Sequence, residues 1–196
     1  KDILINCFES LKSDENPLCY FLIPGLIKLE YDCDNLIQQL KIAMLSSNNN
    51  IMDNAISVTH DISFLKTNSE IESNVGDLKV MLIQLFAVQK EASLYHVSRT
   101  IFLILRDNPS FFTKKELNII TYNVEQFFNL YIDIPEQEVF EKQKFIDIAE
   151  NYLEIVIELS ELNYTVDLEK WINWCSLSNY PEIKKYAFEL NELPKN

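Results

Sequence analysis

The chain has 196 residues, of which 47% are hydrophobic and 24% charged, and its 30 acidic and 17 basic residues give a formal net charge of -13. This composition is too hydrophobic for a disordered chain and too highly charged for a membrane protein. Nucleotide-binding loops, tight β-hairpins and β-sandwiches need several glycines at positive φ, and the chain has only two glycines. Its length is sufficient to bury a sizeable core, so we expect one globular domain over residues 1–196.

Hydrophobic residues recur every three or four positions through nearly the whole chain, which is typical of amphipathic helices. In chain order, helices are predicted over residues 17–30, 34–47, 51–65, 77–91, 94–107, 113–131, 135–162, 167–177 and 180–193. Asn16 is a favourable cap for the first of these, and Pro24 either kinks or divides it. The polar stretch from Thr67 to Gly76 is expected to form a loop. The sequence thus predicts an all-α fold of about ten helices in antiparallel pairs, with no strand.

The connection before the sixth of these helices contains two local signals. Thr113 and Glu116 have the spacing of a capping box, in which each side chain bonds the backbone N–H of the other residue. Just before them, Phe111 and Phe112 either fill the joint between neighbouring helix pairs or stand exposed as an anchor for a partner. We expect them to fill the joint.

The last predicted helix has a distinctive residue pattern, made by Pro181, Ile183, Lys184, Ala187 and Leu190. With these residues, the segment 180–193 resembles the second helix of a HEAT repeat, which places Pro, Val, Arg, Ala and Leu at the same positions. The first hydrophobic residues of three predicted helices, Ile51, Val97 and Ile183, are 46 and 86 residues apart, and a period in the forties is typical of helix-pair repeats. The resemblance implies an α-solenoid of the HEAT or armadillo type. An irregular helical bundle is the alternative.

Motifs for common enzymatic chemistry are absent from the sequence. Gly25 and Gly76 are too far apart for a phosphate-binding loop or a G-x-S-x-G turn. His60 and His96 lie outside any H-E-x-x-H or Glu-x-x-His pattern, and we expect both at the edge of a hydrophobic face. No C-x-x-C pair occurs, so the cysteines are expected to be reduced core residues: Cys7, Cys19, Cys33 and Cys175. We therefore predict no catalytic residue, no metal site and no cofactor.

The N-terminal residues do not form a signal peptide, because Asp2 and Glu9 interrupt any hydrophobic stretch there. The longest uncharged hydrophobic stretch is residues 17–27, which is shorter than the roughly 20 residues that a membrane-spanning helix needs. We therefore expect a cytoplasmic protein without a membrane segment. Because no initiator Met is present, we also expect the chain to be part of a longer protein.

Nucleic-acid binding is disfavoured by the charge distribution. Phosphate recognition needs concentrated basic residues, whereas the lysines are scattered and the chain has only two arginines, Arg99 and Arg106. These lie seven positions apart and share a helix face. With a net charge of -13 around them, we expect a structural ion pair and no contact with phosphate.

The strongest electrostatic feature is a line of five carboxylates on the predicted helix 135–162. The line consists of Asp147, Glu150, Glu154, Glu158 and Glu161. Their spacing of three and four residues places them within about 40° of one line on the helix, opposite a hydrophobic face. We predict that this line faces solvent or is directly paired, and that it forms or borders a surface for a partner with basic groups. A surface that only keeps the protein soluble is the alternative.

These observations favour a protein–protein interaction scaffold or a regulatory helical module without catalytic activity. The first alternative is an acidic inhibitor or immunity-type protein that caps a basic enzyme. The second is a helical enzyme domain of an unrecognised type, which would need a concave pocket with several converging polar groups.

Overall fold

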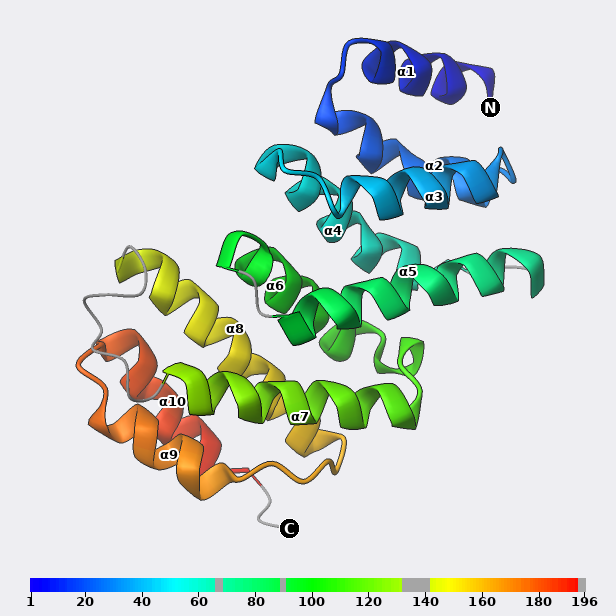
Figure 1. Cartoon of the computed structure of the whole chain (residues 1–196). Helices are drawn as coiled ribbons and strands as arrows, with labels where there is room; N and C mark the ends of the chain where they lie inside the picture. Colours follow the sequence, from blue (N-terminus) through cyan, green and yellow to red (C-terminus); the bar gives the residue numbers. More distant parts are fainter. Residues whose placement is uncertain (66–68, 89–90, 132–141, 194–196) are drawn as a thin grey trace. The chain divides into compact units, whose positions relative to one another are not determined.

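The computed structural model describes residues 1–65, 69–88, 91–131 and 142–193 (Figure 1). Within these ranges the structure is 83% helical, with ten α-helices and no strand. The prediction of an all-α fold is therefore confirmed. No helix in the described part of the chain is long and hydrophobic enough to cross a membrane.

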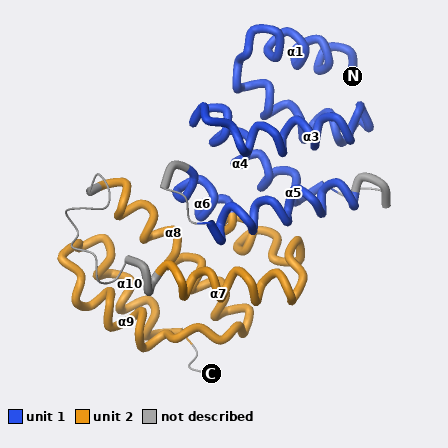
Figure 2. The backbone as a smooth tube through the Cα atoms, viewed as in Figure 1, with its two compact units in different colours: residues 1–100 blue, residues 101–196 orange. Residues whose placement is uncertain are grey.

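The chain packs as two compact units, residues 1–100 and 101–196 (Figure 2). The first unit contains α1 (Asp2–Ser13), η1 (Pro17–Leu22), α2 (Ile23–Lys28), α3 (Cys33–Ala43), α4 (Asn49–Ser63), α5 (Ser69–Val88) and the first part of α6 (Glu91–Asp107). The second contains the end of α6 and then η2 (Pro109–Phe111), α7 (Lys114–Tyr131), α8 (Lys142–Glu161), α9 (Leu168–Leu177) and α10 (Pro181–Asn191). The elements η1 and η2 are short 3-10 helices. The single domain expected from chain length stays a prediction, because a compact unit is not by itself an independently folding domain.

Proline sets the local structure at the start of the first unit. The Asn16 side chain accepts a hydrogen bond from the Leu18 backbone N–H at 3.0 Å and so caps η1. Pro24 then occupies the first turn of α2, where its missing N–H is not needed. Of the two possibilities for the helix predicted over residues 17–30, division is the one found: η1 ends at Leu22 and α2, with Pro24 in its first turn, begins at Ile23. At Gly25 a Cβ atom would lie 3.1 Å from the Leu4 side chain, so glycine lets α1 approach.

The stretch predicted as a loop up to Gly76 is helical from Ser69 onward, and this part of the prediction was wrong. Contacts with α3 explain the difference. The Asn74 side chain donates a hydrogen bond to Asp34, and Asp77 pairs with Lys41 at 3.1 Å. Polar residues that look like a loop in the sequence are thus held as the first turns of α5. Residues 66–68 lie outside the described residues.

In the second unit, α7 begins with the predicted capping box. The Thr113 N–H donates to Glu116 Oε2 at 2.7 Å, and the Glu116 N–H donates to Thr113 Oγ1 at 3.4 Å. Phe112 is buried, as predicted, whereas Phe111 is half-buried and meets the Phe112 ring edge-on. Helix α7 then packs on α8, and α10 packs on both α8 and α9. The start of α8 predicted near Pro135 lies outside the described residues.

The structure gives no sign of HEAT-like repeats. The resemblance of residues 180–193 to a HEAT helix rests on a proline at the helix start and on hydrophobic spacing. In α10, Pro181 does occupy the first turn, and Ile183 and Leu190 are buried. Any amphipathic helix that begins with proline meets these conditions, so the α-solenoid remains unconfirmed.

Glu125 of α7 joins α7 to α9 through two hydrogen bonds. Its Oε1 accepts from the indole Nε1 of Trp171 at 3.1 Å, and its Oε2 accepts from Lys170 Nζ at 3.3 Å. Trp171 is fully buried. The indole N–H therefore depends on a carboxylate that lies 46 residues earlier in the chain.

We predict that Glu125→Leu lowers the free energy of unfolding by about 1–3 kcal/mol, because a buried N–H then loses this acceptor. Glu125→Gln keeps an acceptor oxygen and should cost less. Lys170→Met, which removes the partly exposed ion pair with Glu125 and keeps the acceptor of Trp171, should cost about 0–1 kcal/mol. Urea unfolding followed by circular dichroism measures all three. Equal stability of Glu125→Leu and the unmodified protein would contradict the prediction.

Candidate functional site

Helix α8 holds all five carboxylates of the predicted line on the side opposite its hydrophobic face. Residues of that face are completely buried: Ile148, Ala149, Tyr152, Ile155, Val156 and Leu159. Of the carboxylates only Glu161 is exposed, and Asp147, Glu150, Glu154 and Glu158 are half-buried. The prediction that the line faces solvent is thus corrected for four of its five members. At Glu150 and Glu154 the cause is α10, which packs on α8 and contacts both residues.

The first part of the line is engaged within the chain. The Asp147 carboxylate accepts a hydrogen bond from the Gln143 side chain at 2.8 Å. From α10, Lys185 Nζ lies 3.0 Å from Glu150 Oε1, and the Tyr186 hydroxyl donates to Glu154 Oε1 at 2.7 Å. Direct pairing, the other arrangement predicted for the line, is therefore found for Glu150.

Tyr186 is well suited to hold Glu154 in place. Its side chain is buried, and burial together with the bond to Glu154 raises the pKa of its hydroxyl far above the ordinary value. The phenol therefore keeps its proton at physiological pH and remains a donor. The hydrogen bond from Tyr186 on α10 therefore holds the Glu154 carboxylate on the side of α8 that faces α10.

Three carboxylates of the line and Asp107 of α6 form a group with unbalanced charge around Glu158. We call this group the acidic cluster: Asp107, Glu154, Glu158 and Glu161. Burial raises the pKa of Glu158, and the neighbouring carboxylates of Glu161 and Glu154 raise it further. Arg106 acts in the opposite direction. Of the described charged groups that act on Glu158, three are carboxylates and one is a guanidinium.

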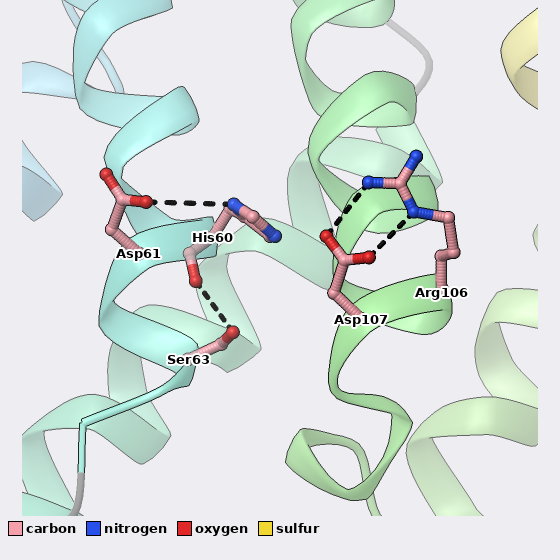
Figure 3. Close-up of polar contacts among 5 residues, drawn as sticks. All are labelled: His60, Asp61, Ser63, Arg106 and Asp107. Carbon is pink, nitrogen blue, oxygen red and sulfur yellow. Dashed lines mark hydrogen bonds and ion pairs between the residues drawn. The ribbon is translucent and has the colours of Figure 1, made fainter.

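Arg106 is engaged mainly with its sequence neighbour. Its Nε and Nη2 atoms lie 2.7 and 3.0 Å from the two carboxylate oxygens of Asp107 (Figure 3). This two-point bond is the main reason why the pKa of Arg106 is raised. The structural ion pair predicted for the arginines is confirmed for Arg106. Because its guanidinium is shared with Asp107, the acidic cluster keeps an excess of negative charge.

The two histidines lie in the first unit and are half-buried, as predicted for the edge of a hydrophobic face. His60 Nδ1 is 3.7 Å from Asp61, and the Ser63 hydroxyl donates to the His60 backbone oxygen at 2.7 Å (Figure 3). His96 Nε2 is 3.1 Å from Asp53 Oδ2, a contact between α6 and α4. The sequence indicated Asp61 as a partner of His60 because the two residues are adjacent. It could not indicate Asp53 as the partner of His96, because that contact forms only in the folded chain.

The cysteines are all free thiols, but only two of the four lie in the core. Cys19 and Cys175 are buried, and burial raises the pKa of Cys175 to about 12. Cys7 is exposed and Cys33 is half-buried, so the prediction of core cysteines was wrong for Cys7 and is not met by Cys33. Cys7 lies in α1, a helix that is not among those predicted from the sequence. Among the described residues, no group of three or more His, Cys, Asp or Glu side chains is placed to hold a metal ion.

The raised pKa of Glu158 predicts a pH-dependent effect of Glu158→Gln. A carboxyl whose pKa is higher in the folded than in the unfolded state destabilises the fold once it is ionised. At pH 7 the substitution should therefore raise the free energy of unfolding by about 0.5 kcal/mol, the size of like-charge repulsion along a helix. The gain should disappear as the pH falls toward about 4, where both states become protonated.

Glu154→Gln is the matched control, because it removes a neighbouring charge but also weakens the bond from Tyr186. It should give no gain in stability at pH 7. Thermal unfolding of both variants at several pH values measures the effect. A gain for Glu158→Gln that persists unchanged at low pH would show that relief of charge repulsion is not the cause.

Comparison with known proteins assigns no family to this chain. No family model, no curated protein and no solved structure matches it.

Proposed function

We propose that this chain is a protein-binding helical module, without catalytic activity of its own, whose acidic cluster binds basic side chains of a partner protein. The observation that supports this most directly is the unbalanced charge around Glu158, where three carboxylates oppose one guanidinium. An incoming Lys or Arg would offset repulsion that is already present in the folded chain.

A protein partner fits this arrangement better than a single ion. Glu154 and Glu161 are seven residues apart on one helix, so they lie about 10 Å apart along its axis. Ligands of one ion must converge on a point, and in the described part of the chain no group of three or more His, Cys, Asp or Glu side chains is placed to do so. Separate basic side chains on another protein can reach separate carboxylates along the same line.

The carboxylates along α8 differ in their contacts, and this difference suggests two roles. Glu150 and Glu154 have partners from α10, so their first role is to hold α8 and α10 together. Glu158 and Glu161 remain the part that faces an incoming basic group. The carboxylates nearest the end of α8 are therefore the better choice for a functional test than the centre of the line.

We predict that the double substitution Glu158→Gln, Glu161→Gln abolishes binding of a short arginine-rich peptide and leaves the fold intact. Backbone amide shifts of the isotopically labelled protein, recorded by NMR during a peptide titration, measure the binding. In the unmodified protein the shifts should concentrate at the end of α8 and around Arg106. They should decrease as salt rises from about 0.05 to 0.5 M, because exposed charges are then screened.

The matched control is Glu9→Gln with Glu72→Gln, which changes the net charge equally at two exposed positions on α1 and α5. This control should bind the peptide like the unmodified protein. If both double variants lose binding equally, only the net charge of the chain matters. If neither does, the acidic cluster serves solubility, and the proposal is wrong.

A further inference from the structure

An open pocket of about 640 Å³ lies within the first unit. Side chains from α1, η1, α3, α4 and the α3–α4 connection line it, among them Lys12, Tyr20, Gln39, Ile42, Leu45 and Ile51. Its volume falls within the range of about 300–1,000 Å³ that is usual for small-molecule sites. The acidic cluster contributes no residue to it, so an inference about the pocket is independent of the proposed function.

One side of the pocket is hydrophobic and uncovered. Ile42 and Leu45 are each 64% exposed, although the hydrophobic residues next to them, Ala43 and Met44, are buried. Exposed aliphatic side chains at the edge of a concave site are surfaces that a bound molecule can remove from water. The aliphatic wall therefore indicates a ligand with a hydrophobic part.

The charge of the pocket is opposite to that of the whole chain. Lys12 is the only charged side chain among the described residues that line it, in a chain of net charge -13. Its ammonium lies 5.7 Å from the centre of the Phe8 ring, and in the described part of the chain it forms no ion pair. A carboxylate could therefore bind Lys12 without displacing an acidic residue of the chain.

The other polar groups of the pocket are neutral. Burial raises the pKa of both the Cys19 thiol and the Tyr20 hydroxyl, so neither is an anion at physiological pH. Gln39 adds an amide. These groups can donate hydrogen bonds to an anion and do not repel it.

We propose that this pocket binds a small amphipathic carboxylic acid, with its aliphatic part against Ile42 and Leu45 and its carboxylate paired with Lys12. A cation of the same shape would be repelled by the one charge in the pocket. A carboxylate without a hydrophobic part would leave the aliphatic wall in water. Both parts of the ligand are thus required.

Octanoate is a suitable probe, with octylammonium and acetate as its matched controls. In an NMR titration below the micelle-forming concentration, octanoate should saturate and shift the backbone amides of Tyr20, Ile42 and Leu45. Octylammonium and acetate at equal concentration should not. An octanoate titration without saturation, or equal binding of octylammonium, would overturn the proposal.

Variants test the two contacts separately. Lys12→Met keeps the length of the exposed side chain and removes its charge, so octanoate affinity should fall about tenfold. Lys28→Met, at an exposed lysine that does not line the pocket, is the control and should bind like the unmodified protein. Leu45→Glu places a carboxylate on the exposed wall and should abolish octanoate binding. Circular dichroism checks that each variant folds, and unchanged affinity of both Lys12→Met and Leu45→Glu would also overturn the proposal.

Discussion

The burial of one face of α8 is the constraint on which the second unit depends. Six residues of that face, from Ile148 to Leu159, are inaccessible to solvent. The Tyr152 ring stacks on Phe127 of α7 with the ring centres 3.7 Å apart. Removing this much hydrophobic surface from water stabilises the unit strongly. It also fixes the rotation of α8 about its axis, and therefore the direction of every other side chain on it.

The carboxylates of α8 lie on the side opposite this buried face, and four of the five are half-buried. Their energetics follow from that partial burial. A carboxylate that is half removed from water needs a partner or becomes easier to protonate. Glu150 and Glu154 have partners in Lys185 and Tyr186. Glu158 has mostly other carboxylates around it, and its pKa is raised. Partial burial is thus accompanied by contacts with α10 at Glu150 and Glu154, and by a surplus of negative charge at Glu158.

The first unit uses charge differently. Among the described residues that line its pocket, Lys12 is the one charged residue, together with neutral polar groups and exposed aliphatic side chains. In a strongly acidic chain, such a local reversal directs an anion to one place, because the surrounding carboxylates repel it elsewhere. The two proposed sites therefore differ in the sign of the ligand group they accept.

Local spacing in the sequence was sufficient to predict most of the helices, an interruption near Pro24, and the capping box at Thr113 and Glu116. Each depends on residues within one or two helical turns. The same local pattern predicted the five carboxylates of α8 as one line, because side-chain direction on a helix follows from sequence position. It could not show that Ser69 to Gly76 is helical, since those turns are held by contacts with α3.

Burial and pairing of the carboxylates were decided only by the tertiary structure. Tyr186 and Glu154 are 32 residues apart in the sequence, and no spacing rule connects them. The pocket around Lys12 likewise joins residues from α1, η1, α3 and α4. Local spacing determines which residues share a helix face. The packing of the helices determines which of those residues are buried. It thereby also determines which charged groups are paired within the chain and which remain available to a ligand.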